Sequence, residues 1–363
     1  MAPRKKVTRA RRRPGRLTGR SSSAAAWPPP AYALYHGLPL SYGVTLPVLG
    51  IPVKFSSNST DVLDAVEESF GIWRGFKPTS ARDGRREPIT VRLIVFRGDE
   101  RGHAWVPLTW HIPDGRRAVF HSPGSVGMLD LDRRDVFAYV TPALMADRAH
   151  FRYSVLEALT LTTVNDSDRY PVHAGGLVRN GTVLLLAGHS GSGKSTLVYA
   201  AMRSGLNVLS DDAVYVQTHP AFRIWGAPGR LYLRPEARRH FAELSSLESV
   251  VLANGKTKVM VPVDRARAAP VAVVAKRVGV VLLARGRGSV SVRAVSPRTL
   301  ESALTRDLAL PIARYGSNMR TVVRRLTARG GWRLTISPRP AESLPFLHRI
   351  FDWLDRRPPL KAG

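Results

Sequence analysis

The sequence contains no cysteine. This absence excludes disulfide bonds, zinc sites built on thiolates and a cysteine nucleophile. The sequence also lacks a run of about 18 uninterrupted apolar residues, the length that a membrane-spanning helix needs, so no membrane span is predicted. The first residues, 1–6, hold no hydrophobic segment of the kind found in a secretory signal, and a cytoplasmic location is therefore expected.

Acidic residues are scarce, because 27 Asp and Glu stand against 55 Lys and Arg, for a formal net charge of +28. The imbalance is strongest in residues 1–20, which are rich in Arg and Lys and hold no acid. Such a block cannot pack, and it predicts a disordered basic tail. A solvated extension explains the tail better than a nucleic-acid-binding arm, because the tail lacks aromatic side chains that stack on bases. Weak binding of a polyanion is the alternative.

The length of 363 residues favours two domains. Residues 1–30 are predicted to be the tail and a linker rich in Ser, Ala and Pro. Residues 31–165 are predicted to form a small α/β domain, with helices over 58–73 and 144–164 among short strands. Residues 166–363 carry the motifs that point to a function.

In the first domain we find no grouping of side chains that suggests chemistry. Its acids Asp61, Glu67 and Glu68 are interpreted as charges at a helix start and on a solvated face.

A phosphate-binding motif organises the second domain. The apolar stretch Thr182–Ala187 predicts a buried strand, which a glycine-rich turn and a helix follow, and the turn matches G-x-x-x-x-G-K-[ST]. Glycines let successive backbone N–H groups surround a phosphate, and the helix adds its own unpaired N–H groups. In such a loop Lys194 binds the β- and γ-phosphates, and the Ser195 hydroxyl holds Mg²⁺. The predicted nucleotide-binding residues are Gly188, Ser190, Gly191, Ser192, Gly193, Lys194, Ser195 and Thr196.

A pair of adjacent acids follows the next predicted strand, Asn207–Ser210. Asp211 and Asp212 lie 17 and 18 residues beyond Lys194, where phosphate-loop proteins place the acid that reaches Mg²⁺. Side chains alternate along an extended backbone, so the two carboxylates are expected to point to opposite sides. One can hold the metal while the other accepts a proton from an attacking hydroxyl.

A histidine lies close to the same loop in the sequence. His173 belongs to a predicted strand over Val172–Val178, which a tight turn at Asn180-Gly181 joins to the strand before the phosphate loop. Ligands of α/β sheets bind at the strand ends that carry such loops. His173 is therefore either catalytic or a structural histidine, and the residues alone do not decide between the two.

Several basic residues are candidates for binding phosphate. Lys256 and Lys258 flank Thr257 after a glycine-containing turn, and they either contact phosphates or form a plain basic turn. Arg230, Arg234 and Arg314 can each serve as a transition-state cation, and nothing in the sequence selects among them.

The three motifs, taken in order, resemble the catalytic domain of bacterial HPr kinase/phosphorylase. In that family a His-Gly dipeptide precedes the phosphate-loop strand and an Asp-Asp pair follows the loop helix. Here the dipeptide is His173-Ala174, and the resemblance is confined to residues 172–214. The segment Ile224–Arg234, where that family carries a metal-binding Glu, has no Glu.

The resemblance implies an α/β fold, a P-loop kinase domain of the phosphoenolpyruvate-carboxykinase and HPr-kinase type, with a mixed sheet and flanking helices. It implies that Asp212 is the base that deprotonates an acceptor serine and that His173 is its catalytic neighbour. Lys194 would be catalytic too, through its contact with the phosphates, and Ser195 and Asp211 would hold the metal.

The predicted function is therefore the transfer of the γ-phosphate of ATP, with Mg²⁺, to a serine hydroxyl of a protein or peptide. A small-molecule kinase and a non-catalytic nucleotide-binding regulatory module are the alternatives. Besides the protein or peptide substrate, a second copy of the chain is a possible partner, and the sequence leaves the oligomeric state open.

Overall fold

The computed structural model describes residues 39–77, 87–96, 109–122, 125–252, 254–286, 288–305 and 313–360. The predicted basic tail and linker lie outside the described residues. Residues Pro39–Gly363 form one compact unit. Within the part of the chain that is described, no helix has both the length and the apolar character needed to cross a membrane.

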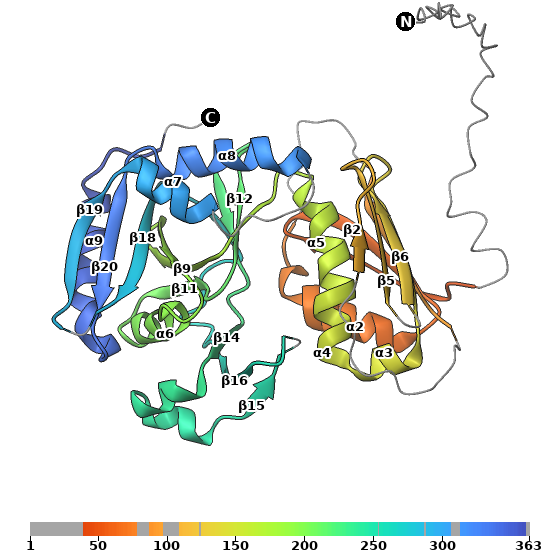
Figure 1. Cartoon of the computed structure of the whole chain (residues 1–363), viewed down its shortest axis with the longest axis horizontal. Coiled ribbons are helices and arrows are strands. Elements are labelled where there is room, and N and C mark those ends of the chain that lie inside the picture. The colour runs from red at the N-terminus through yellow and green to blue at the C-terminus, as the bar shows by residue number, and fades with distance from the viewer. Residues whose placement is uncertain are drawn as a thin grey trace, which may run out of the picture. The chain divides into compact units, whose positions relative to one another are not determined.

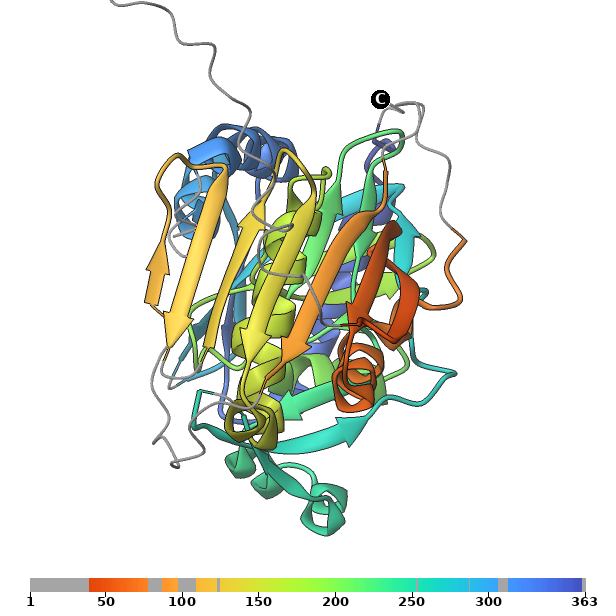
Figure 2. The ribbon, with the colours of Figure 1, turned by 90° about the vertical axis from the view of Figure 1, so that its right-hand side faces the viewer.

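The first part of the described chain is a seven-stranded mixed sheet, whose strands Figure 2 shows side by side. β2–β3 and β3–β7 pair in parallel, and the other neighbours are antiparallel. In spatial order the strands are β1 (Tyr42–Val48), β2 (Ile51–Ser57), β3 (Ile89–Val95), β7 (Asp135–Val140), β6 (Ser125–Asp130), β5 (Arg117–Ser122) and β4 (Thr109–His111). β1 is not predicted from the sequence, because Gly43 and Pro47 interrupt its pattern. An edge strand tolerates both residues.

Helices pack on one face of this sheet (Figure 1). The predicted helix over 58–73 is confirmed as α2 (Thr60–Phe70), continued by the 3₁₀ turn η1 (Gly71–Trp73). The helix predicted over 144–164 begins earlier and is interrupted. It consists of α3 (Pro142–Ala146), α4 (Arg148–His150), the π-helical segment η2 (Phe151–Glu157) and α5 (Ala158–Asn165).

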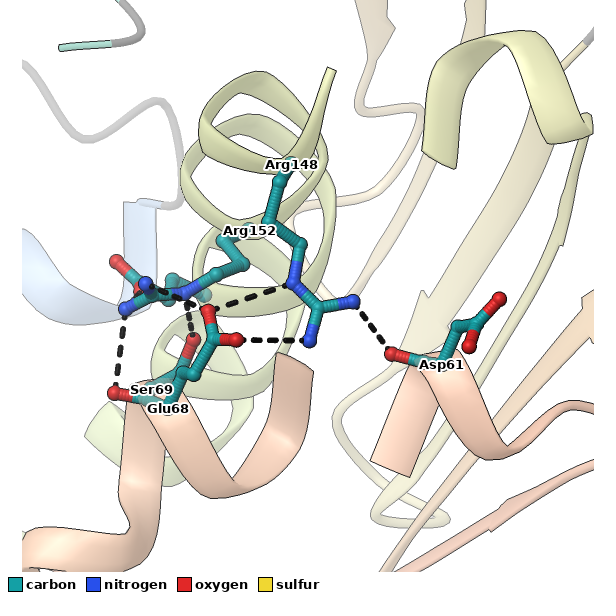
Figure 3. A network of polar contacts seen from close by, with 6 residues as sticks. Asp61, Glu68, Ser69, Arg148 and Arg152 are labelled. Carbon is teal, nitrogen blue, oxygen red and sulfur yellow. Dashed lines mark hydrogen bonds and ion pairs between the residues drawn. The ribbon is translucent and has the colours of Figure 1, made fainter. Parts of the chain in front are cut away.

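An ion-pair network fixes α2 to α4 and η2, as Figure 3 shows. The Glu68 carboxylate accepts hydrogen bonds from Arg148 Nη2 at 3.0 Å and from Arg152 Nη1 at 3.1 Å. Arg152 Nε also donates to Ser69 Oγ at 2.9 Å, and Arg148 Nη1 donates to the backbone oxygen of Asp61. The hydrogen bond from Arg148 is the largest influence on the pKa of Glu68 and lowers it. Glu68 is thus a structural ion-pair partner rather than a freely solvated charge.

The second large sheet has six strands and is mixed, as the resemblance implies. β10–β18 and β18–β20 are parallel, and the remaining pairs are antiparallel. The predicted hairpin is confirmed, with Asn180 and Gly181 both at positive φ between β9 and β10. In spatial order the strands are β11 (Asn207–Ser210), β9 (Ala174–Arg179), β10 (Thr182–Ala187), β18 (Arg277–Arg285), β20 (Gly331–Ile336) and β19 (Ser291–Val295).

Alternate residues of β10 face two different core clusters. Leu184 and Leu186 belong to a cluster with α6 (Lys194–Arg203) and α9 (Leu344–Asp355), which follows the 3₁₀ turn η5 (Pro340–Ser343). Val183 and Leu185 belong to a cluster with α7 (Pro297–Thr305) and α8 (Ala313–Thr327). Because every residue of β10 is buried, its near-continuous apolar run predicts the strand correctly.

Two smaller sheets complete the fold. The four-stranded sheet has the order β17 (Ala272–Val274), β13 (Arg223–Trp225), β12 (Val214–Gln217) and β8 (Tyr170–Val172). The three-stranded sheet has the order β14 (Arg230–Leu233), β16 (Thr257–Pro262) and β15 (Ser249–Val251), with the 3₁₀ turns η3 (Pro235–Arg239) and η4 (Ala242–Ser246) between its strands.

Two strands predicted as continuous are each divided between sheets. The segment 172–178 is divided at His173, because β8 joins the four-stranded sheet and β9 the six-stranded one. The sequence also predicts that 213–217 continues the strand 207–210, but that segment forms β12 in the four-stranded sheet. An apolar pattern shows which side chains are buried but not which strand is the partner. Both predictions were therefore wrong at the residues where the chain passes from one sheet to the other.

Trp225 of β13 links the two regions. It is fully buried in the same core cluster as the residues that join the seven-stranded sheet to its helices. Phe76 packs against it with ring centroids 4.6 Å apart, and Trp73 Nε1 donates to the backbone oxygen of Gly226 at 3.0 Å. The predicted domain limits stay a prediction, but the core of the first region includes this tryptophan from beyond residue 165.

Candidate functional site

The divided strands bring His173 and Asp212 together. Both residues lie on connections that run between the six-stranded and the four-stranded sheet, and the flanking strands pair on either side of them. His173 Nδ1 lies 3.4 Å from Asp212 Oδ1. The side chains are 40% and 73% exposed, so a substrate can reach both. The sequence predicts each residue separately, and their contact follows from the crossing of the two chain segments.

The predicted phosphate loop joins β10 to α6. Gly191 and Gly193 have φ values of 85° and 99°, in the left-handed region that favours glycine. A Cβ at Gly193 would lie 2.7 Å from Ile336 Cδ1, so the end of the Ile336 side chain would have to shift. Lys194 is 7% exposed, and its Nζ donates to the backbone oxygen of Gly188 at 2.7 Å. The ammonium group therefore lies across the mouth of the loop.

The start of α6 provides donors suited to an anion. The first bond of the helix runs from the Leu197 N–H to the Gly193 oxygen at 2.9 Å. The N–H groups of Ser195 and Thr196 come before that bond, so helix geometry gives them no intrahelical acceptor. Ser192 has a different position, because its N–H donates to the His189 oxygen at 3.1 Å and its buried hydroxyl has no partner among the described residues.

Asp211 and Ser195 form the pair that the sequence predicts for a metal. Asp211 is 5% exposed and accepts hydrogen bonds from the Tyr232 N–H at 2.9 Å and from the Ser195 hydroxyl. Burial raises the pKa of Asp211 to about 6, the Tyr232 N–H and the Ser195 hydroxyl lower it, and the neighbouring Asp212 raises it further. A buried carboxylate with so high a pKa has too little positive charge around it, and a divalent cation would supply that charge.

The residues present fit a magnesium ion bound together with a nucleotide. Mg²⁺ in such sites takes one or two protein ligands and completes its shell with phosphate oxygens and water. Among the described residues no group of three or more His, Cys, Asp and Glu gathers around one point. The hydroxyl of Ser195 and the carboxylate of Asp211 suffice for this kind of site, whereas a site made of protein ligands alone would need more.

Two cations that the sequence could not select also lie here. The pairing of Leu233 with Val259 places Arg234 opposite Lys258 at the ends of β14 and β16. A Cβ at Gly191 would lie 3.2 Å from the Arg234 guanidinium, so Arg234 rests against the phosphate loop. Burial lowers the pKa of Lys258, Arg234 lowers it further, and Asp211 and Asp212 raise it, as expected for an ammonium group near all three.

Of the three arginines proposed as transition-state cations, the structure thus places Arg234 at the loop. Arg230 lies at the other end of β14 and is exposed. The side chain of Arg314 lies outside the described residues. The alternation of β14 puts Arg234 and Tyr232 on one face, but the register of β14 against β16 cannot be obtained from the sequence.

A scan against models of known protein families finds no match for this chain, and a search of curated proteins finds none either. Among solved structures, the chain is similar to the Hpr(Ser) kinase/phosphatase from Coxiella burnetii. The two are 12% identical, the similarity covers 50% of this chain and 92% of that one, and the TM-score is 0.27. So distant a similarity assigns no activity.

Proposed function

We propose that this protein is a kinase that uses ATP and Mg²⁺ to phosphorylate a serine hydroxyl of a protein or peptide. The observation that carries the proposal is the 3.4 Å contact between His173 and Asp212. An exposed carboxylate oriented by a histidine, next to a phosphate loop with a buried hydroxyl–carboxylate pair, is an arrangement suited to phosphoryl transfer.

Each residue has a role that follows from its position. Asp212 accepts the proton of the acceptor hydroxyl, and His173 holds the carboxylate in place. Ser195 and Asp211 would hold Mg²⁺, while the loop N–H groups and Lys194 would bind the phosphates. Bound ATP supplies the phosphoryl group, and Mg²⁺ neutralises part of its charge.

Arg234 and Lys258 add positive charge beside the phosphate loop. Phosphoryl transfer requires stabilisation of the charge that develops on the phosphate oxygens, and fixed cations provide it. Arg234 reaches the loop at Gly191, and Lys258 is close enough to Asp211 and Asp212 for these carboxylates to raise its pKa. We therefore assign both residues to binding the phosphoryl group while it is transferred.

The test follows the label from γ-labelled ATP, incubated with the purified protein and a lysate of its own source. We expect acid-stable label on serine of a polypeptide. The label should disappear with Asp212→Asn and persist with Asp61→Asn, which changes an exposed carboxylate on α2. Both variants should still bind nucleotide.

Two other outcomes would refute the proposal. Label that depends on Asp212 but appears in a small metabolite would identify a small-molecule kinase. Nucleotide binding without any transfer that depends on Asp212 would identify a regulatory binding module.

A further inference from the structure

A cavity of about 630 Å³ opens beside the contact between His173 and Asp212. It is lined by His173 itself, by Ala213, which follows Asp212 in the chain, and by the first residues of the phosphate loop, Gly188 and His189. Its lining does not include Ser195 or Thr196, at the start of α6, where the phosphates of a bound nucleotide would lie. The cavity therefore lies on the side of the proposed base.

The sheet register fixes the size of this space. One row of residues crosses four strands, from Ala174 through Ala187 and Leu282 to Arg333. His173 directly precedes this row at one end, and Arg333 closes it at the other. Three strand spacings separate the two ends by roughly 14 Å, and Ala187 and Leu282 form an apolar floor between them.

Arg333 gives the far end of the cavity a positive charge, and Arg285 adds a second positive charge three residues beyond Leu282 along β18. Arg333 and Arg285 are its charged lining residues, and the described lining contains no Asp or Glu. Arg333 is half-buried, and neither arginine forms an ion pair with a described residue. A second cavity of about 370 Å³ shares Leu282 and Arg333 with the first and adds Arg298. Guanidinium groups without partners in a concave site bind carboxylate or phosphate.

We propose that this cavity receives the acceptor, and that the acceptor is a serine peptide with an acidic side chain held by Arg333, with Arg285 as the second cation of the lining. The serine hydroxyl would lie at the His173 end. An arginine side chain spans about half of the row, so the anion lies some 7 to 10 Å from the hydroxyl, which is two or three residues of extended peptide. This inference rests on the proposed kinase function and adds to it the chemistry of the substrate.

The first test measures binding and does not need turnover. Octapeptides with one fixed serine and randomised flanks are retained on the immobilised protein, in the presence of Mg²⁺ and ADP, and sequenced. We expect enrichment of Asp and Glu at an offset of two or three residues from the serine. The enrichment should fall roughly tenfold in Arg333→Gln and in Arg285→Gln, since a charged hydrogen bond is lost.

The matched control is Arg293→Gln. Arg293 pairs with Arg333 across β19 and β20 and is exposed, but it does not line the cavity. Its variant should select peptides as the unaltered protein does. Absence of acidic enrichment, equal enrichment in the Arg333 and Arg285 variants, or acidic enrichment that appears only when ADP is left out would overturn the inference. Enrichment that ADP prevents would mean that the cavity holds the nucleoside.

A second measurement separates this inference from the proposed function. The enriched peptide and its Gln counterpart are compared as acceptors by kcat/KM. A preference of about tenfold for the acidic peptide, lost through KM in Arg333→Gln, supports both proposals. Equal transfer to both peptides overturns the inference and leaves the kinase. Selective binding without transfer overturns the kinase and leaves an anion-binding peptide site.

Discussion

Replacing Asp211 by Asn should stabilise the protein that holds no nucleotide or metal, while it removes activity. Burial raises the pKa of this carboxyl from its ordinary value of 3.8 to about 6. The folded state therefore binds the Asp211 proton more tightly than the unfolded state does. The stability that this group contributes is fully present below pH 3.8 and is lost as the pH rises through about 6.

The magnitude follows from the same shift. About two pKa units at 1.36 kcal/mol each give roughly 3 kcal/mol as the cost of ionised Asp211 at pH 8. Asn keeps an oxygen that can accept from the Tyr232 N–H, and its amide can donate to the Ser195 hydroxyl. It carries no charge, although its amide also has to be desolvated. We expect a gain of about 1 to 3 kcal/mol, or roughly 2 to 8 °C in Tm.

The assay is thermal unfolding of the two proteins in EDTA at pH 8 and at pH 5. Asp211→Asn should unfold at a higher temperature than the unaltered protein at pH 8, and the difference should shrink at pH 5. The control is Asp212→Asn, because the Asp212 side chain is 73% exposed. Its gain should be smaller, since it removes only the contribution of the Asp212 charge to the pKa of Asp211 and leaves the larger contribution of burial. A lower Tm for Asp211→Asn at pH 8, or an equal gain in both variants, would refute the reasoning.

Three further changes test the loop, its cations and the packing of the first helices. Arg234→Gln should lower kcat by roughly 10- to 100-fold in the labelled-ATP assay, since a cation at the loop is lost, whereas Arg230→Gln should not. Gly193→Ala should weaken ADP binding measured by calorimetry at least tenfold, because its φ of 99° disfavours a side chain and its Cβ would push against Ile336 within the loop. Gly255→Ala, with φ at 73° and open space, should not weaken it. Glu68→Gln should lower the free energy of unfolding by about 0.5 to 1 kcal/mol in urea denaturation, because the ion pairs are partly exposed; no change would show that the network is not stabilising.

The sequence predicts the centre of the fold well and its connections poorly. β10 and the turn at Asn180-Gly181 follow from a fully apolar run and from residues that tolerate positive φ. β1 is missed because Gly43 and Pro47 look like breakers, although an edge strand accommodates them. Local sequence patterns thus identify the elements whose conformation is set by neighbouring residues in the chain, and they miss those that depend on a position in the sheet.

The candidate site divides in the same way. Spacing alone singles out Asp211, Asp212 and Lys194, because the phosphate loop, its helix and the next strand follow one another in the chain. The approach of His173 to Asp212 requires knowing that two segments change sheets at neighbouring points. Arg234 is placed by the register of β14 against β16, which no local pattern encodes. The roles of all these residues stay predictions until transfer is measured.

The burial of Trp225 in the core of the seven-stranded sheet connects that sheet to the candidate site, although no residue of the sheet is assigned to the chemistry. Asp212 lies two residues before the start of β12, which pairs with β13, and β13 buries Trp225 among the residues of the first core. The orientation of Asp212 toward His173 therefore depends on β12 being held in place from both sides. Removing the seven-stranded sheet would uncover Trp225 and the Gly226 oxygen that accepts from Trp73. A change of activity after such a truncation would thus report on the support of β12 and β13 as well as on any direct contact with a substrate.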